Sequence, residues 1–109
     1  MERVNYGKLV QELLERDFGN RKTSATEVQL IFDPKRDRYL VLHLGWLDSR
    51  RVFGCLVCVQ IKDGKIWIER DGTEVGFANE LVEAGVPKTD IVLGFQAPYK
   101  REFTEFAAG

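Results

Sequence analysis

The residues of this 109-residue chain that could do chemistry are few, beginning with two cysteines. Cys55 and Cys58 are separated by two residues, a spacing found in many metal and redox sites. In a regular strand, side chains three positions apart point to opposite faces, so we expect the two thiols to diverge. A structural zinc site also needs four ligands, and the chain has no second pair of cysteines. We therefore expect two small buried apolar residues, with no metal and no other cofactor.

A second candidate is His43, the only histidine and a possible general base. Nucleophilic catalysis would need an oriented serine or cysteine and a carboxylate beside it, but its predicted cross-strand neighbour is Gly54. We interpret His43 as a packed or interface residue. The acidic residues are no better placed, because Asp63 lies in a predicted turn and Glu69 is followed directly by an arginine. The sequence thus favours a protein that binds over an enzyme.

Basic side chains form small clusters in the predicted turns and near the C-terminus. The 16 basic and 17 acidic residues give a formal net charge of -1, so the overall charge does not favour phosphate binding. Each cluster also contains acidic residues, which is typical of solvated turns. The candidates for a direct nucleic-acid contact are Arg36, Arg38, Lys62, Lys65, Lys100 and Arg101.

The composition describes one ordinary globular domain over residues 1–109, with 44% hydrophobic and 30% charged residues. Charged residues interrupt the segment from Val4 to Phe18, which excludes the apolar core of a signal peptide. No apolar run approaches the roughly 20 residues that span a bilayer. Two cysteines without an export signal indicate reduced thiols, so we expect a cytoplasmic protein with no membrane association.

The elements that must position these residues begin with a helix at residues 4–18. Apolar residues recur there at spacings of three and four, which is typical of a helix packed on one face. Gly19 and Asn20 should end the helix, and residues 21–26 should form a loop. Alternating patterns then predict strands at residues 27–33, 38–46, 51–62 and 65–70.

Two tight turns predict how these strands pair. Asp63-Gly64 suits a type I′ turn, which pairs Lys62 with Lys65, and therefore Ile61 with Ile66 and Val59 with Ile68. A turn at Asp48-Ser49 predicts the pairs Leu44–Phe53, Leu42–Cys55 and Leu40–Val57, with all of these residues on one core face. The opposite face would carry Tyr39, Val41, His43, Val52, Leu56, Cys58 and Trp67.

That second face is too apolar for a solvated surface, so a helix, the C-terminal segment or another subunit should cover it. We expect a twofold dimer there, with Tyr39, Val41, His43, Leu56 and Trp67 as candidate interface residues. The first hairpin, around residues 33–37, can have a loop of four or five residues. The sequence therefore leaves open which face of the sheet Val28, Leu30 and Phe32 occupy.

After the meander, Thr73 should cap a second helix that packs through Val75, Ala78, Leu81 and Val82. Its start is also a possible anion site, but Glu74 would repel phosphate and capping is favoured. Gly85 should end the helix, with Val86 making the hydrophobic contact after it. Residues 90–95 predict a fifth strand, while residues 96–109 fit either a helix or an irregular docked segment.

The predicted fold class is therefore α+β. An N-terminal helix packs on an antiparallel β-meander of four to five strands, and a second helix, a C-terminal strand and a docked tail follow.

Five stretches of the chain carry a resemblance to a known family: IFDPKRDRYLVLHLGW, RRVFGC, IKDGKIWIERDGTE, ELVEAGVPKTDIVLGF and KREFTEFAAG. Through them the chain resembles, over nearly its whole length, the XisI-like family, the fdxN element excision controlling factors of cyanobacteria. The family's members are described as accessory factors for excision of the fdxN element during heterocyst development. They typically occur beside XisH-like proteins, which resemble nuclease folds.

The resemblance implies an accessory role in site-specific DNA recombination, without a set of catalytic residues. Two functions remain open. The first is a regulator that binds an XisH-like protein; the alternative is a direct DNA-binding accessory protein that uses the basic residues named above.

Overall fold

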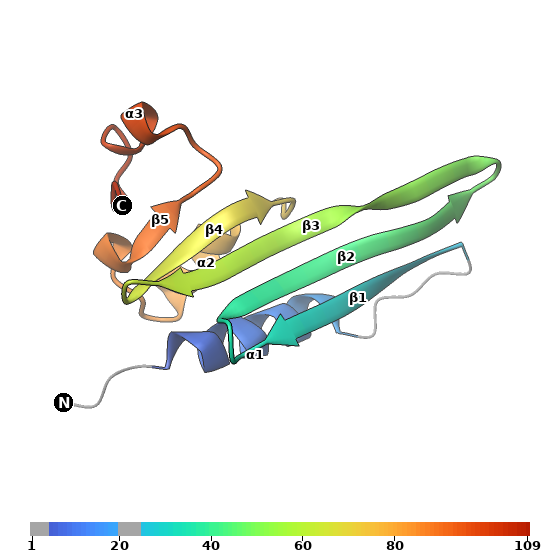
Figure 1. The fold of residues 1–109 in the computed structure, drawn as a ribbon, viewed down its shortest axis with the longest axis horizontal. Helices are drawn as coiled ribbons and strands as arrows, with labels where there is room; N and C mark the ends of the chain where they lie inside the picture. The colour runs from blue at the N-terminus through green and yellow to red at the C-terminus, as the bar shows by residue number, and fades with distance from the viewer. Residues whose placement is uncertain (1–4, 20–24) are drawn as a thin grey trace.

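The computed structural model describes residues 5–19 and 25–109, and every structural statement below concerns those residues. Their elements are α1 (Tyr6–Phe18), β1 (Thr26–Asp33), β2 (Arg38–Leu47), β3 (Arg50–Lys62), β4 (Lys65–Asp71), α2 (Phe77–Glu83), the 3₁₀ turn η1 (Lys88–Asp90), β5 (Ile91–Leu93) and α3 (Pro98–Arg101) (Figure 1). The strands form one sheet in the order β1-β2-β3-β4-β5, which confirms the α+β class. Val4, Asn20 and most of the predicted loop at residues 21–26 lie outside the described residues.

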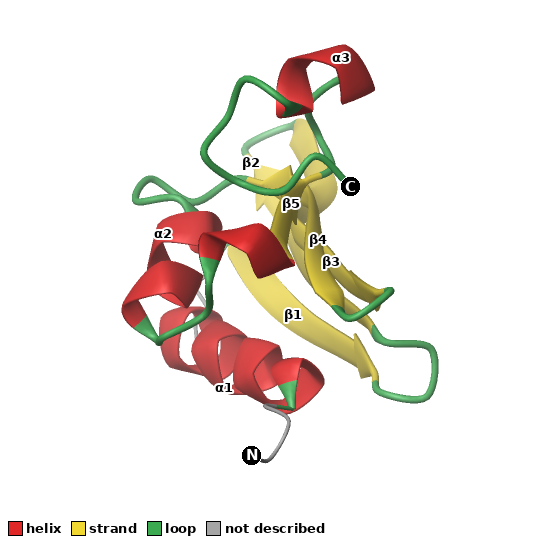
Figure 2. Ribbon diagram, turned by 90° about the vertical axis from the view of Figure 1, so that its left-hand side faces the viewer, coloured by secondary structure: helices red, strands yellow, loops and turns green. Residues whose placement is uncertain are grey.

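Helix α1 lies along one side of the sheet. Asn5 caps it, because the side-chain oxygen accepts a hydrogen bond from the backbone of Lys8 at 3.0 Å. At the other end, the N–H of Gly19 bonds the carbonyl of Glu15 at 2.8 Å. Its buried stripe consists of Gly7, Val10, Leu13, Leu14 and Phe18. Figure 2 shows α1 and α2 together on this side of the sheet, with α3 apart from them in the C-terminal segment.

The β3–β4 hairpin has the predicted turn and register. Asp63 and Gly64 both have positive φ, at 53° and 75°, as a type I′ turn requires. Lys62 pairs with Lys65, and the core-facing pairs Ile61–Ile66 and Val59–Ile68 follow. This hairpin supplies much of the core that faces the helices.

The β2–β3 pairing departs from the prediction at Leu56. From the turn the register is the expected one as far as Leu42–Cys55, but the next pair is Val41–Val57 rather than Leu40–Val57. Leu56 is therefore the extra residue of a β-bulge, and it reverses the alternation of β3 relative to the turn. A single core face running the length of both hairpins was a wrong prediction.

Because of the bulge, the residues of β2 that lie in the core are the ones predicted for the opposite face. Tyr39 and Val41, which pair with Val59 and Val57, lie in the core at 1% and 0% exposure. His43 and Val52 lie on the same helix-bearing side by alternation. The residues predicted for the core turn to the opposite face instead: Leu40, Leu42, Leu44, Phe53 and Cys55. In β1, the register places Val28, Leu30 and Phe32 toward the helices.

Helix α2 begins later than predicted and is capped differently. Its first residue is Phe77, whose backbone N–H donates to Asp71 at 2.7 Å. Thr73 does not cap the helix; its hydroxyl accepts from the backbone of Gly76 and donates to Asp71. Val75 consequently precedes the helix and is 67% exposed, so its predicted packing role was wrong.

The end of α2 follows the prediction. Gly85 has φ 101°, and Val86 donates to Leu81 at 3.0 Å and is buried. The chain then returns through η1, so that β5 pairs parallel to β4. The C-terminal segment docks beside β5 through a bridge between Val92 and Ala107, which confirms a docked tail in which only α3 is helical.

The β3–β4 turn generates the first testable prediction. We expect Gly64→Val to destabilise the protein by about 1–2 kcal/mol, because a β-branched residue is strained at positive φ. The measurement is the free energy of unfolding in urea. Gly54→Val is the matched control, since Gly54 lies in a strand and a Cβ added there would have nothing within 4 Å. Equal stability of the two variants would contradict the assignment of the turn.

Candidate interaction surface

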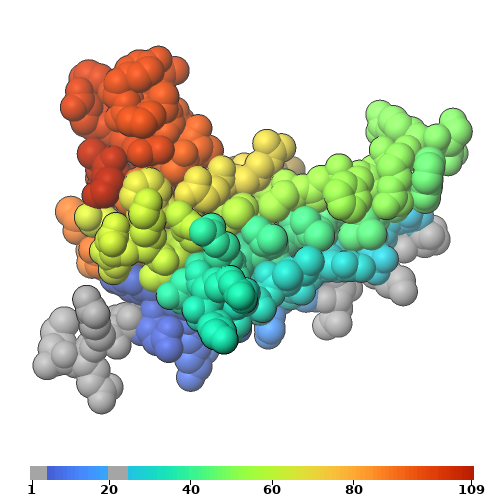
Figure 3. Space-filling view, viewed as in Figure 1, coloured from blue at the N-terminus to red at the C-terminus, as the bar shows by residue number. Residues whose placement is uncertain are grey.

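The face of the sheet away from the helices has an apolar central part, bordered by Glu27 and Gln29 of β1. It carries Ile31 of β1 and the row Leu40, Leu42, Leu44 and Trp46 of β2, next to Phe53 and Cys55 of β3, as the registers require. Three of these side chains are well exposed: Ile31 at 43%, Trp46 at 54% and Phe53 at 67%. Figure 3 views this face, which runs between the C-terminal segment at one end and the β2–β3 hairpin at the other. We refer to it as the open face.

The β2–β3 hairpin extends the open face beyond the body of the protein. β4 pairs with β3 only from Val57 onward, so the hairpin up to Leu47 and Arg50 forms a projecting arm (Figure 1). The guanidinium of Arg51 lies over the rings of Trp46 and Phe53, at 5.4 and 5.6 Å from their centroids. A cation over two exposed rings is a common feature of recognition surfaces.

The predicted interface residues are not gathered on one surface. Tyr39 and Val41 are core residues, so their assignment to an interface was wrong, and the bulge is the reason. Leu56 is the bulge residue and packs in part against the core. His43 is partly buried on the helix side opposite Gly54. Only Trp67 lies on the open side of the sheet.

Trp67 is packed against the C-terminal segment. Arg101 lies over its ring at 5.3 Å and Lys62 at 4.8 Å, from the tail and from β3 respectively. Arg101 also donates to the carbonyls of Gln96 and Gly94, which fixes its guanidinium against the tail backbone. The tail therefore closes one end of the second face, and the arm end stays open.

The candidate nucleic-acid residues are all engaged within the chain. Arg36 pairs with Asp33 at 3.1 Å, and Arg38 bonds Gln60. The amine of Lys65 donates to the carbonyl of Gly109 at 2.8 Å, and Lys100 lies near the ring of Tyr99. Lys62 and Arg101 both lie over the ring of Trp67. Of the six, the structure brings together Lys62, Lys65 and Arg101 around the docked tail, while Lys100 extends from α3.

The two cysteines lie on the same face, contrary to the sequence prediction. The bulge between them means that both Cys55 and Cys58 pair with open-face residues of β2. Burial raises the pKa of the Cys58 thiol, and the neighbouring Cys55 raises it further. Both thiols are free, and no group of three His, Cys, Asp or Glu side chains in residues 5–19 and 25–109 could hold a metal ion.

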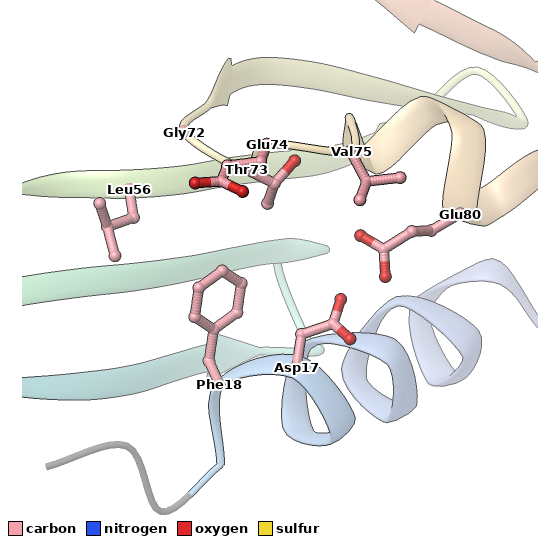
Figure 4. Close-up of a pocket in the computed structure, with 8 residues that line it drawn as sticks. All are labelled: Asp17, Phe18, Leu56, Gly72, Thr73, Glu74, Val75 and Glu80. Atoms are coloured by element: carbon pink, nitrogen blue, oxygen red, sulfur yellow. The ribbon is translucent and has the colours of Figure 1, made fainter.

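A cleft of about 490 Å³ lies on the helix side, between the end of α1 and the loop before α2 (Figure 4). The carboxyl groups of Asp17 and Glu80 face each other across it, and Arg16 binds both, at 3.2 and 2.7 Å. Burial, followed by the hydrogen bond with Asp17, raises the pKa of Glu80 to about 7. This cleft is acidic and offers little to an anionic ligand.

No described helix is long and apolar enough to cross a membrane. The fold and its surfaces define a small α+β protein with helices on one side of a sheet and an exposed apolar face on the other.

Comparisons with known proteins agree with this class. The XisI protein family matches residues 1–108. A crystal structure of a XisI-like protein from Anabaena variabilis ATCC 29413 is 41% identical, with a TM-score of 0.91, over 99% of this chain and 100% of that one. The fdxN element excision controlling factor XisI of the same organism is 42% identical, with a TM-score of 0.82, over 95% and 96%. A comparison with curated proteins gave no match. The chain belongs to the XisI family.

The carboxyl pair in the acidic cleft predicts a pH dependence of stability. The pKa of Glu80 is about 7 in the folded protein and near 4.5 when unperturbed. The folded state therefore holds this proton more tightly, and the stabilisation is complete below about pH 4.5 and lost as the pH rises through 7. We expect Glu80→Gln to raise the melting temperature at pH 8 relative to the native chain, with a smaller difference at pH 5.

Glu83→Gln is the matched control, because it removes one negative charge from the exposed side of the same helix. If both substitutions change the pH profile equally, net charge explains the effect and the carboxyl pair does not.

Proposed function

We propose that this protein is a non-catalytic accessory factor that controls excision of an fdxN-type DNA element by binding another protein. One relative is named as an fdxN element excision controlling factor, which supports the excision role. The single observation that carries the binding mode is the open face, an apolar and aromatic sheet surface that stays exposed at its arm end. The partner that we propose is an XisH-like protein.

The shape and chemistry of the open face suit a protein partner. Ile31, Trp46 and Phe53 are exposed apolar anchors on a continuous surface, and aromatic residues dominate the binding energy of many protein interfaces. A small-molecule ligand would need a mostly apolar concave site, whereas the cleft beside α2 places three carboxylates, Asp17, Glu74 and Glu80, among its lining residues. The open face is thus the better candidate.

The absence of catalysis is also part of the proposal. His43 faces the helix side opposite Gly54, and neither Cys55 nor Cys58 is paired with it across the sheet. Free thiols fit a reducing compartment, so we infer that the protein acts in the cytoplasm. We also infer that it forms a homodimer.

Direct DNA binding is the second candidate, and one observation favours it. Lys62 and Arg101 flank Trp67, and Lys65 lies beside the same docked tail. Basic side chains around an aromatic ring can contact both phosphates and bases. Against it, Lys65 and Arg101 hold the tail in place, and the chain carries no net positive charge.

The protein-binding proposal predicts the effect of charges on the open face. We expect Ile31→Glu and Trp46→Glu each to weaken binding of an XisH-like protein at least tenfold, about 1.4 kcal/mol, because a carboxylate would be desolvated at the interface. Isothermal titration calorimetry gives the affinity. Val75→Glu is the control, since Val75 is also exposed but lies on the helix side before α2. Unchanged binding by both open-face variants would refute this surface.

The same proposal predicts the behaviour with DNA. We expect the purified chain to bind duplex DNA only weakly with a shallow dependence on salt, and to leave DNA intact in the presence of magnesium or manganese. Fluorescence anisotropy across a salt series and gel analysis measure the two properties. A steep salt slope that Lys62→Glu reduces would favour the DNA-binding alternative, and specific cleavage would show that the protein is an enzyme.

A further inference from the structure

The outer edge of β3 is unpaired along the arm. Its pairing with β4 ends where Val57 meets Asp71, at the last residue of β4. Among the residues that the structure describes, no strand pairs with Arg50–Leu56 on that side, although the backbone N–H of Gly72 bonds the carbonyl of Leu56 at 2.6 Å. Figure 1 shows β3 continuing past the end of β4. An unpaired edge of this length is a template for another strand.

Two observations show which backbone groups point outward. The carbonyl of Cys55 accepts a hydrogen bond from Nε of Arg70 at 3.1 Å, so it faces the outer edge. At the other end, the two-residue turn closes on the pair Leu47–Arg50, which is hydrogen-bonded in such hairpins. Strand alternation then directs the N–H and C=O groups of Arg51 and Phe53 away from β2, toward solvent.

We propose that a second copy of this chain pairs its own β3 with this edge, antiparallel, about a twofold axis at Val52. Arg51 then lies opposite Phe53 of the second copy, and the two residues exchange both of their backbone hydrogen bonds. Val52 faces Val52 of the second copy. This register uses the outward groups of Arg51 and Phe53 and leaves the bond between Cys55 and Arg70 in place.

The side chains on the arm suit a second copy. Phe53 is 67% exposed and Trp46 is 54% exposed, and Arg51 already lies over both rings. In the dimer, Arg51 also lies beside Phe53 of the second copy, so each ring gains a cation from across the axis. The pairing therefore covers the most exposed aromatic residue of the sheet with residues that complement it.

Charge complementarity favours this chain over an unrelated strand. The register brings Asp48 of the second copy level with Leu56, beside Arg70. Arg70 is exposed, and its guanidinium is held at the edge by the carbonyl of Cys55. Asp48 in the turn of one arm thus meets a basic residue at the base of the other arm, once on each side of the axis.

Disulfide trapping tests the register. In a chain with Cys55→Ser and Cys58→Ser, we expect Val52→Cys to give a covalent dimer quickly on mild oxidation, because directly opposed residues of a non-hydrogen-bonded pair lie about 4.5 Å apart at Cα. Gln29→Cys, which places an exposed cysteine on the opposite edge strand β1, is the control. Trapping of Val52→Cys no faster than this control would overturn the proposal.

A proline substitution tests the edge without a new thiol. Phe53→Pro removes an outward N–H while leaving the bonds between β3 and β2, and Phe53→Ala removes the ring alone. In sedimentation at high micromolar concentration, we expect the native chain to dimerise and Phe53→Pro to dimerise at least tenfold more weakly than Phe53→Ala.

A native chain that stays monomeric would overturn the proposal and identify Arg50 and Arg51 as charges that protect the edge. A dimer that Phe53→Pro leaves unchanged would overturn it too, in favour of another surface. Circular dichroism checks the folding of each variant, and if Phe53→Pro fails to fold, the trapping experiment decides. None of these measurements depends on an XisH-like protein.

Discussion

The bulge at Leu56 is the constraint on which the arrangement of this protein depends. It is the only point at which β2 and β3 change their relative phase, and it lies where β4 ends and the arm begins. The carbonyl of Leu56 accepts a hydrogen bond from the backbone N–H of Gly72 at 2.6 Å, so the bulge does not leave this carbonyl unpaired. A Cβ on Gly72 would lie 2.9 Å from that carbonyl oxygen, which explains a glycine there.

Because of the bulge, the apolar residues of β3 point to different faces of the sheet on its two sides. After the bulge in the chain, Val57 and Val59 pack in the core with the helices. Before it, Phe53 and Cys55 lie on the open face. Without the extra residue, the arm would present its apolar row to the helix side, where α1 could cover only part of it. The apolar residues of β2 and β3 therefore face the helices in the body of the sheet and face the open side in the arm.

The sequence predicted the features that depend on local chemistry. The turn at Asp63-Gly64 and the helix end at Gly85-Val86 were correct, since positive φ and a missing side chain specify them within a few residues. The bulge was missed because residues 55–59 are continuously apolar, which hides the alternation that reports the phase of a strand. The start of α2 was missed because Asp71, six residues before Phe77, provides the cap.

The candidate site was predicted in character but not in position. The sequence indicated an apolar second face, yet of its five proposed residues only Trp67 lies there, and the tail covers it. Arg51 and Phe53 belong to both the open face and the free edge of β3. Their side chains lie on the open face, and their backbone N–H and C=O groups point to the free edge. Pairing at the edge would therefore join two open faces into one continuous surface, and a partner protein would meet that doubled surface instead of a single arm. The bulge at Leu56 thus turns the side chains of the arm to the open face, and it lies at the point where β4 ends and the edge of β3 becomes free.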